Sequence, residues 1–461
     1  MFLMCFSLFI SLDKNDFIDF NQTKQSYQED KSSFFEKITN SQNYEIKEIE
    51  QSGTCGSSVN FTLESNTLTI IGEGQMKNYT DSLSNQPPWK SKTSSIKTVI
   101  ISPGVTSIGS RSFYECSMLT NVEIPNSVTF IGYSAFYSCN SLESITIPES
   151  VISIGQGVLR SCKNLKNIEI LGNITIIDHW MFANSPSFHE IRIPESVISI
   201  GQEAFDHCIS LEHITVPESV TSFGYSTFSS CTSMKSITIL GKIKSFGYYL
   251  FKSCTNLTSI IIPESTTLVA GYVFSSCVNL KNVTILGSIT KIGEYAFQYC
   301  SSLHDINIPN SVNLIEKYAF YSCTSLTSIE IPNKVTSIAE YTFYSCKRLK
   351  NISISKSVIY INNNVFSFCT DLENIIIPES VSSIGESSFS SCTSLQEITL
   401  SKKITSISKS VFSSCTSLES ITIPESVTSI GESAFSSCTS LKEIQIPKNV
   451  KSIGNYGFSS C

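Results

Sequence analysis

"IPESVTSIGESAFSSCTSL", residues 423–441, holds one cysteine that follows a phenylalanine by three residues and is surrounded by hydroxyl-bearing side chains. The same arrangement recurs along most of the chain. From Cys116 to Cys461 each cysteine follows the previous one by 23 residues, except where Ser185 takes the expected place. A fixed period of this length is typical of repeat architectures. The sequence therefore predicts one long array of similar units.

Other positions keep the same period. Phe stands three residues before each cysteine, with Leu159 as the exception, and a large apolar residue stands three residues after it. Two β-branched positions follow, such as Ile421 and Ile423, and Pro commonly comes next. The pattern L-x-x-I-x-I predicts a short strand that Pro terminates. The rest of each unit is too short for a crossover helix but long enough for turns, an extended piece and one helical turn.

Each unit is thus predicted to form one coil of a solenoid. A single coil cannot bury its apolar face, whereas the sixteen stacked units of residues 93–461 bury it continuously. We expect a β-rich fold with a parallel sheet on the concave face. Short turns or single helical turns are expected on the convex side.

The pattern C-x-x-L-x-x-I-x-I-P, closed by I-G-x-x-A-F-x-x-C, resembles the 23-residue leucine-rich repeat of the BspA-like surface-protein family. The segment "GTCGSSVNFTLESNTLTIIGEG", with "MKNY" and "PPWK" after it, is similar to the N-terminal cap of such arrays. The resemblance implies a leucine-rich-repeat solenoid that is exported to the cell surface. It also implies a role in adhesion or host interaction, without catalysis.

The chain divides into segments of different composition. Residues 1–12 are a candidate secretory signal peptide or a buried N-terminal segment, and residues 13–50 read as a flexible polar leader. Residues 51–92 are expected to form a small β-rich cap with strands at 59–63 and 68–71. Its Trp89 is expected to cover the first coil. The repeats run to Cys461 without a C-terminal cap.

Composition limits the partners of the protein. Of the 461 residues 41% are hydrophobic and 15% charged, and the formal net charge is −7. An acidic chain is a poor match for nucleic acid, which needs clustered Lys and Arg. No segment of the sequence is long and apolar enough to span a membrane. Sequons indicate an extracellular or surface glycoprotein; one is at Asn21, and the glycosylation candidates are Asn60, Asn78, Asn173, Asn256, Asn282 and Asn351.

The seventeen cysteines allow several interpretations. Stacked coils bring successive cysteines within disulfide distance, but a regular column offers no unique partner. Ser185 in one slot favours a ladder of small buried thiols. Scattered disulfides and metal binding or catalysis are the alternatives.

A catalytic interpretation of the repeat fails on its sequence. A nucleophile elbow needs Gly-x-Ser-x-Gly, and Ala434 and Phe435 follow Ser433. The same turn also recurs as "GESSF" at 385–389, whereas a catalytic site is seldom copied in every coil. The sequence predicts no enzyme, no cofactor and no metal.

Binding is expected on the concave face, at the residues five and seven positions after each cysteine. One region, residues 178–213, departs from the repeat and contains four of the five histidines. Drift in one degenerate repeat is the favoured explanation, and a local ligand or metal site and a bend in the arc are the alternatives. The candidate binding residues are His189, Glu190, Arg192, Glu212 and His213.

A second irregularity has a period of its own. The Pro that follows the strand is replaced at Leu171, Leu240, Leu286, Ser355 and Ser401. These positions alternate by 69 and 46 residues, which gives a period of five units, or 115 residues. The array is therefore predicted to have grown by duplication of a five-unit block.

The predicted function is binding of proteins or glycans, including host or extracellular-matrix proteins, at the cell surface. Two alternatives are a passive surface coat or spacer and an intracellular protein-interaction scaffold.

Overall fold

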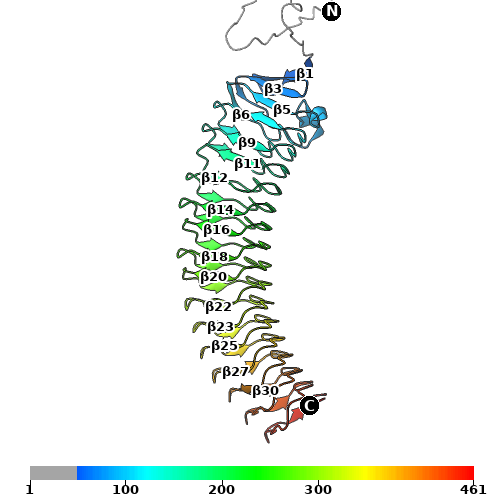
Figure 1. Ribbon diagram of the computed structural model, residues 1–461, viewed down its shortest axis with the longest axis vertical. Coiled ribbons are helices and arrows are strands. Elements are labelled where there is room, and N and C mark those ends of the chain that lie inside the picture. The colour runs from blue at the N-terminus through cyan, green and yellow to red at the C-terminus, as the bar shows by residue number, and fades with distance from the viewer. Residues whose placement is uncertain (1–48) are drawn as a thin grey trace, which may run out of the picture. The chain divides into compact units, whose positions relative to one another are not determined.

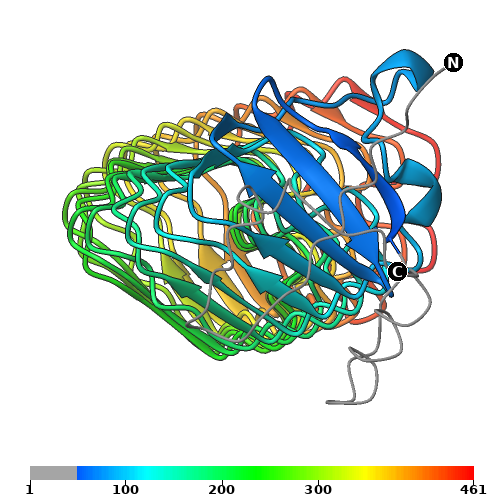
Figure 2. The ribbon, with the colours of Figure 1, turned by 90° about the horizontal axis from the view of Figure 1, so that it is seen from above.

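Each 23-residue unit forms one coil, and the coils stack along a gently bent axis (Figure 1). The computed structural model describes residues 49–461, so the predictions for residues 1–48, Asn21 included, lie outside the described residues. Seen along the stack, successive coils overlie one another (Figure 2). The predicted β-rich solenoid with parallel strands is confirmed.

In most coils the segment five to eight residues after the cysteine position forms the longer strand, as predicted. We call the surface that these strands carry the strand face. In register, each residue pairs with the one 23 positions along the chain, as in Ser144 with Asn167. The strands are β5 (Thr98–Ile101), β7 (Asn121–Glu123), β9 (Ser144–Ile147), β11 (Asn167–Ile170), β14 (His213–Val216), β16 (Ser236–Ile239), β18 (Ser259–Ile262), β20 (Asn282–Ile285), β23 (Ser328–Glu330), β25 (Asn351–Ser353), β27 (Asn374–Ile376) and β29 (Glu397–Thr399).

A second, shorter strand in each coil forms a second face. It contains the Ile or other apolar residue that stands eight positions before the cysteine, and that side chain is buried in most coils. These strands are β4 (Gly74–Gln75), β6 (Val105–Ile108), β8 (Phe130–Ile131), β10 (Ser153–Ile154), β12 (Ile176–Ile177), β13 (Ser199–Ile200), β15 (Ser222–Phe223), β17 (Ser245–Phe246), β19 (Leu268–Val269), β21 (Lys291–Ile292), β22 (Leu314–Ile315), β24 (Ser337–Ile338), β26 (Tyr360–Ile361), β28 (Ser383–Ile384), β30 (Ser406–Ile407), β31 (Ser429–Ile430) and β32 (Ser452–Ile453).

The third side of each coil, which we call the turn corner, runs over the eight residues that end at the cysteine, such as 431–438. Its N–H groups alternate between two kinds of partner. Ser433 and Phe435 donate to carbonyls of the next coil, whereas Cys438 donates to Phe435 of its own coil at 3.2 Å. Ser433 has a positive φ of 54°. Most backbone donors of this side are thus satisfied without a helix, so the described repeats use turns here.

The cap extends the strand face at its N-terminal end. The antiparallel strands β1 (Ile49–Thr54), β2 (Val59–Glu64) and β3 (Thr67–Gly72) join β5 through a parallel pairing of β3. Both predicted cap strands are therefore confirmed. Two short 3₁₀ turns follow, η2 (Leu83–Asn85) and η3 (Lys90–Lys92).

Trp89 lies between the cap and the first coil. Its side chain is fully buried and stacks on Phe113 with a ring distance of 6.1 Å. Its indole N–H donates to the carbonyl of Ser112 at 2.8 Å. A column of stacked phenylalanines continues from Phe113 to Phe458 at neighbouring ring distances such as 5.2 Å, interrupted at Leu159. This column forms the centre of the core.

The strand face is not one continuous sheet. β5 and β7 continue the five-stranded sheet of the cap, the later strands pair in twos, and every fifth coil has no strand there. The pairs are β5 with β7, β9 with β11, β14 with β16, β18 with β20, β23 with β25, and β27 with β29. The strandless coils, which we call single coils, have residues 190–193, 305–308 and 420–423 at the strand positions. The last described coil, at 443–446, also has no strand.

The five-unit period of the sequence explains this grouping in part. In every pair but the first, the second coil is one that lacks the Pro. Leu240 donates its backbone N–H to Val216 of the preceding coil at 3.0 Å, a bond that Pro cannot make. A Cβ on the following Gly241 would lie 2.1 Å from the carbonyl oxygen of Val220. Leu-Gly therefore draws its coil close to the preceding one, and the same contacts recur at Leu171 and Leu286.

Candidate functional site

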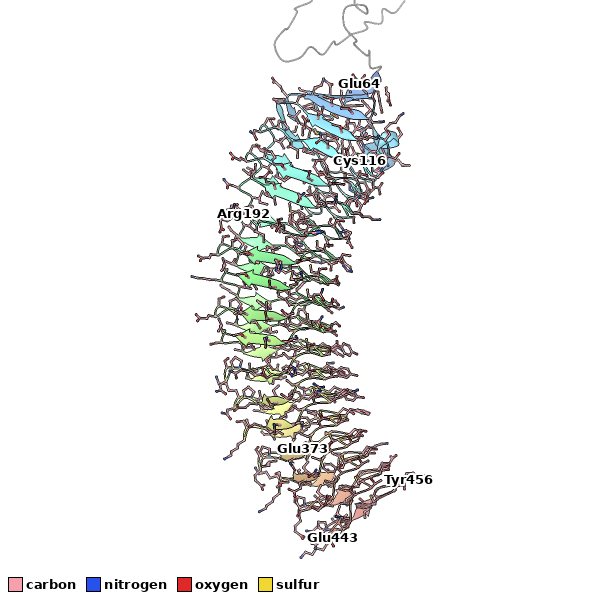
Figure 3. All side chains as sticks on the ribbon, viewed as in Figure 1. Glu64, Cys116, Arg192, Glu373, Glu443 and Tyr456 are labelled. Carbon is pink, nitrogen blue, oxygen red and sulfur yellow. The ribbon has the colours of Figure 1, made fainter. Side chains whose placement is uncertain are left out.

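Side chains alternate along each strand of the strand face. In β9 the two isoleucines are buried, whereas Ser144 and Thr146 are exposed. The exposed positions form two long rows of hydroxyls, amides and scattered charges. Figure 3 shows Arg192 at the edge of the stack that carries this face and Tyr456 at the opposite edge.

A hollow of about 730 Å³ lies on this face around the first single coil, and we call it hollow 1. Within the described residues, the strand segment 190–193 has one isolated bridge, between Arg192 and Thr215. No strand pairing joins it to β11. The hollow is lined by Ser144, Ile145, Thr146, Asn167, Ile168, Glu169, Glu190, Ile191, Arg192, Ile193, Glu195, His213, Ile214, Thr215, Pro217 and Leu240.

Three of the five predicted binding residues line hollow 1, namely Glu190, Arg192 and His213. All three are exposed. The imidazole Nδ1 of His213 lies 2.8 Å from the hydroxyl of Ser236 on the next strand. The structure thus brings these side chains together, and their role in binding remains a prediction.

The other two predicted residues lie outside the lining. The Nδ1 atom of His189 is 2.6 Å from the carbonyl oxygen of Ser187. Glu212 accepts a bond of 2.6 Å from the ammonium of Lys235, which lowers the pKa of the Glu212 carboxyl. His213 Nε2 is 3.9 Å from Glu212. Glu212 is therefore already paired with a cation of the neighbouring coil.

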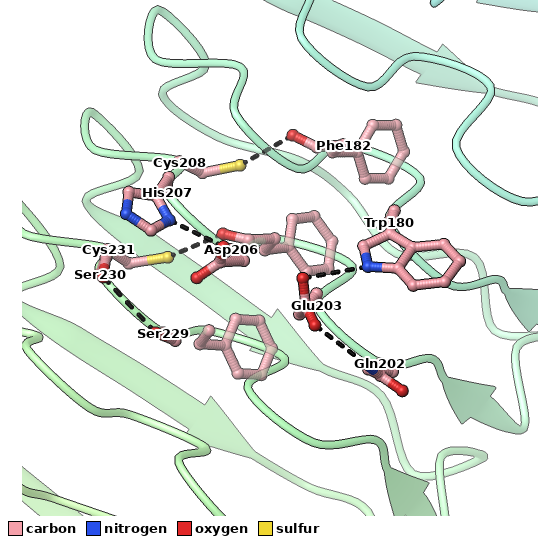
Figure 4. Close-up of polar contacts among 12 residues, drawn as sticks. Trp180, Phe182, Gln202, Glu203, Asp206, His207, Cys208, Ser229, Ser230 and Cys231 are labelled. Carbon is pink, nitrogen blue, oxygen red and sulfur yellow. Dashed lines mark hydrogen bonds and ion pairs between the residues drawn. The ribbon is translucent and has the colours of Figure 1, made fainter. Parts of the chain in front are cut away.

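The remaining histidines of residues 178–213 belong to turn corners. Figure 4 shows His207 with its Nδ1 atom 2.7 Å from a carboxylate oxygen of Asp206. In the same view the indole N–H of Trp180 donates to Glu203 at 3.0 Å. His179 Nδ1 accepts the backbone N–H of Gln202 at 3.1 Å. In the described residues, no three His, Cys, Asp or Glu side chains group closely enough to hold a metal ion.

A second hollow of about 380 Å³ lies at the next single coil, and we call it hollow 2. Sequence reasoning missed it, because its residues follow the ordinary repeat pattern. It is lined by Asp305, Ile306, Asn307, Ser328, Ile329, Glu330, Asn351 and Ser353.

The six described glycosylation candidates are all exposed. Asn282 lies on the strand face in β20, and Asn351 lines hollow 2. A glycan at Asn351 would therefore cover that hollow.

The cysteines form the buried ladder that their spacing predicts. Each described thiol from Cys139 onward donates to the carbonyl of the phenylalanine 26 residues earlier, as Cys277 does to Phe251 at 3.0 Å. Figure 4 shows two steps of the ladder, at Cys208 and Cys231. Burial raises the pKa of Cys277 to about 12. Such thiols are poor nucleophiles and poor metal ligands.

Ser185 keeps the contact of the ladder. Its hydroxyl donates to the carbonyl of Leu159 at 3.1 Å, in the same way as a cysteine thiol. The position thus selects a small side chain that can donate a hydrogen bond.

Sequence reasoning also missed a ladder of stacked tyrosines at the turn corner. Their rings lie 4.5–4.8 Å apart and the residues have positive φ. The recurrence of these tyrosines every 23 residues in the sequence could have predicted the ladder. The members are Tyr249, Tyr272, Tyr295, Tyr318 and Tyr341.

Comparisons with known proteins agree with this architecture. A family model described as "BspA type Leucine rich repeat region" matches residues 90–191, 175–304, 267–392 and 360–461. A solved leucine-rich repeat protein from Bacteroides ovatus is 24% identical, with 86% of this chain and 95% of that chain covered and a TM-score of 0.59. Within residues 49–461, no helix is long and apolar enough to cross a bilayer.

Two further structures are similar over most of their length. A leucine rich cell surface protein from Faecalibacterium prausnitzii is 26% identical, with 90% and 93% of the two chains covered and a TM-score of 0.36. The pneumococcal vaccine antigen PcpA is 18% identical, with 88% and 94% covered and a TM-score of 0.40. A comparison with curated proteins found no match.

Proposed function

Because the chain belongs to the family of BspA-type leucine-rich-repeat proteins, we propose that it binds macromolecules at the cell surface through its strand face. The family is a repeat scaffold and not an enzyme class, so the proposed role is adhesion without catalysis. The partners are proteins or glycans, including host or extracellular-matrix proteins. The observation that carries the proposal is hollow 1, where exposed charged side chains surround a gap in the sheet.

The geometry suits broad contact with a large partner. Hollow 1 extends over several coils, from Ser144 to Leu240, and is open to solvent. The rows of hydroxyls and amides continue from it along the stack. Many weak contacts along such a surface add up when one partner engages them together.

A binding screen of the full chain against matrix proteins and glycans tests the proposal. We expect replacement of His189, Glu190, Arg192 and His213 by Ala to weaken binding of any partner that the screen finds. The matched control replaces Glu264 and Lys448 by Ala, which are exposed charges of both signs outside the hollow. Unchanged affinity of the fourfold variant would contradict the proposed site.

Two measurements distinguish the proposed function from its two alternatives, a passive coat or spacer and an intracellular scaffold. A chain that binds no partner in the screen would be a passive coat or spacer. Mass spectrometry of the native protein separates export from an intracellular scaffold, because glycans and removal of residues 1–12 accompany export. An unprocessed, unglycosylated chain would contradict the surface location.

A further inference from the structure

The two hollows occupy equivalent places in the five-unit block. Hollow 1 surrounds the single coil with residues 190–193, and hollow 2 includes residues 305–307 of the single coil 115 residues later. Stacked strands lie about 4.8 Å apart, so five coils separate the two by about 24 Å. The strand face therefore repeats a recess at a fixed distance.

Both hollows are acidic. Hollow 1 is lined by three carboxylates and one guanidinium, and hollow 2 by two carboxylates without a basic side chain. Within residues 49–461 none of these five carboxylates forms an ion pair, in contrast to Glu212 with Lys235 beside them. The unpaired lining carboxylates are Glu169, Glu190, Glu195, Asp305 and Glu330.

The surface between the hollows is uncharged at its outward positions. The two rows there contain hydroxyls, amides and one isoleucine, Ile261, which is 57% exposed. The residues are Ser236, Thr238, Ser259, Ile261, Asn282 and Thr284. A ligand that matches this surface has cationic groups at both ends and a neutral, partly apolar middle.

We propose that hollows 1 and 2 together bind one extended, basic polypeptide segment. An extended chain advances about 3.3 Å per residue, so basic side chains about seven residues apart reach both hollows at once. Charge complementarity selects the segment, and simultaneous engagement of the two hollows raises its affinity. This inference rests on the proposed function, because it assigns a partner class to the same strand face.

Arg192 allows a prediction of opposite effects for two substitutions in hollow 1. Its guanidinium lines hollow 1, where it opposes a basic ligand. Replacement of Arg192 alone by Ala should strengthen binding of a basic segment, because only the opposing cation is lost, whereas Glu190→Gln should weaken it. The fourfold Ala variant also loses the carboxylate of Glu190 and the contact surface of the two histidines, so its net effect should still be weaker binding. A general loss of fold would weaken binding in both variants.

The test uses synthetic peptides and the full chain produced without glycans, so that Asn351 leaves hollow 2 open. One peptide has two Lys-Arg pairs seven residues apart in a Ser/Thr background, and a second has the same composition with the pairs adjacent. We expect the spaced peptide to bind about tenfold more tightly, and added salt to weaken it. Fluorescence anisotropy measures both affinities.

Substitutions then locate the contacts. Glu190→Gln with Glu195→Gln, and Asp305→Asn with Glu330→Gln, should each weaken the spaced peptide and abolish the preference for spacing. The matched control is Glu397→Gln, an exposed carboxylate of β29 outside both hollows, which should change nothing. Equal binding of both peptides, or an equal effect of Glu397→Gln, would overturn the proposal.

A parallel experiment with neutral glycans and uncharged peptides distinguishes failure of the proposed binding function from failure of the proposed basic partner. If those bind through Glu190 and His213 while the basic peptides do not, the proposed function stands and this inference fails. If no probe binds, both fail.

Discussion

At the scale of single residues, the repeat selects side chains for contacts between coils. The ladder cysteine is buried, and its thiol donates to a carbonyl of the preceding coil. Serines do the same at the turn after the strand, where Ser150 donates to Val128 at 2.6 Å. The Ser and Cys content that first suggests reactivity thus satisfies backbone groups inside and around the stack.

The ladder contact can be tested at Cys277. Replacement by Ser keeps a donor for Phe251 and should lower the free energy of unfolding by less than replacement by Ala, which removes both the donor and buried volume. We expect about 1–2 kcal/mol for Ala, measured as the shift in urea midpoint. Ser185→Ala should behave like Cys277→Ala, and Ser185→Cys should be nearly neutral. Equal losses for Ser and Ala at position 277 would contradict this role.

At the scale of the element, hydrogen bonding decides where the sheet on the strand face is continuous. Leu-Gly after a strand adds an N–H donor and permits a close approach, whereas Pro at the same place does neither. In three of the six pairs the Leu-Gly coil therefore associates with the coil that precedes it, and single coils remain between the pairs. These gaps in pairing place the two hollows.

The close approach can be tested at Gly241. A Cβ there would meet the carbonyl oxygen of Val220 at 2.1 Å, so Gly241→Ala should destabilise the pair of β14 and β16 by about 1–3 kcal/mol. Gly247→Ala is the matched control, because its Cβ would meet nothing closer than 3.8 Å. Hydrogen exchange of β14 and β16 measures the effect. Equal protection in both variants would show that contact with Val220 does not hold the pair.

At the scale of the whole molecule, each coil is stabilised by its neighbours, so the ends of the stack and the shared core columns control its stability. The cap covers the first coil through Trp89. The thiol ladder runs through nearly all described coils, so a change in its ionisation acts on the entire array.

Trp89→Ala should expose the first coil. The loss of a buried indole lowers stability locally by about 3–5 kcal/mol. Hydrogen exchange should therefore quicken in β5 and β7 but not in β27 and β29. Uniform loss of protection along the stack would instead show that the coils unfold together.

Alkaline pH should unfold the array. Thiols of the unfolded chain titrate near 9.0, whereas burial raises the pKa of Cys162 and Cys346 to about 12. Between these values the unfolded state loses protons that the folded state keeps, so stability falls as pH rises through 9 to 12. Each buried thiol contributes a loss of about 1.4 kcal/mol per pH unit in this range.

Circular dichroism against pH measures the transition. A variant with several ladder cysteines replaced by Ser should keep its structure to higher pH than the original chain. Burial also raises the pKa of Tyr295 to about 12, but this affects both proteins equally. If both proteins unfold at the same pH, ionisation of the thiols is not the main cause of alkaline unfolding.

The amino-acid sequence by itself determined the solenoid, because the 23-residue period fixes which side chain follows which along every buried column. The phenylalanine column from Phe113 to Phe458 and the cysteine ladder follow from that period. The cap strands at 59–63 and 68–71 and the place of Trp89 were predicted instead from the local sequence of residues 51–92. The five-unit period was also visible in the sequence. Its consequence for the strand face was not.

Only the tertiary structure decided how the coils pair, where the hollows lie, and which charged residues line them. Those features depend on whether a backbone N–H of one coil comes within hydrogen-bonding distance of a carbonyl oxygen of the neighbouring coil, such as Leu240 with Val216, which composition does not encode. Glu190, Arg192 and His213 line one hollow for this reason, whereas Glu212, one position before His213 in the chain, pairs with Lys235. The sequence therefore determined the array, and the three-dimensional contacts between coils determined its surface.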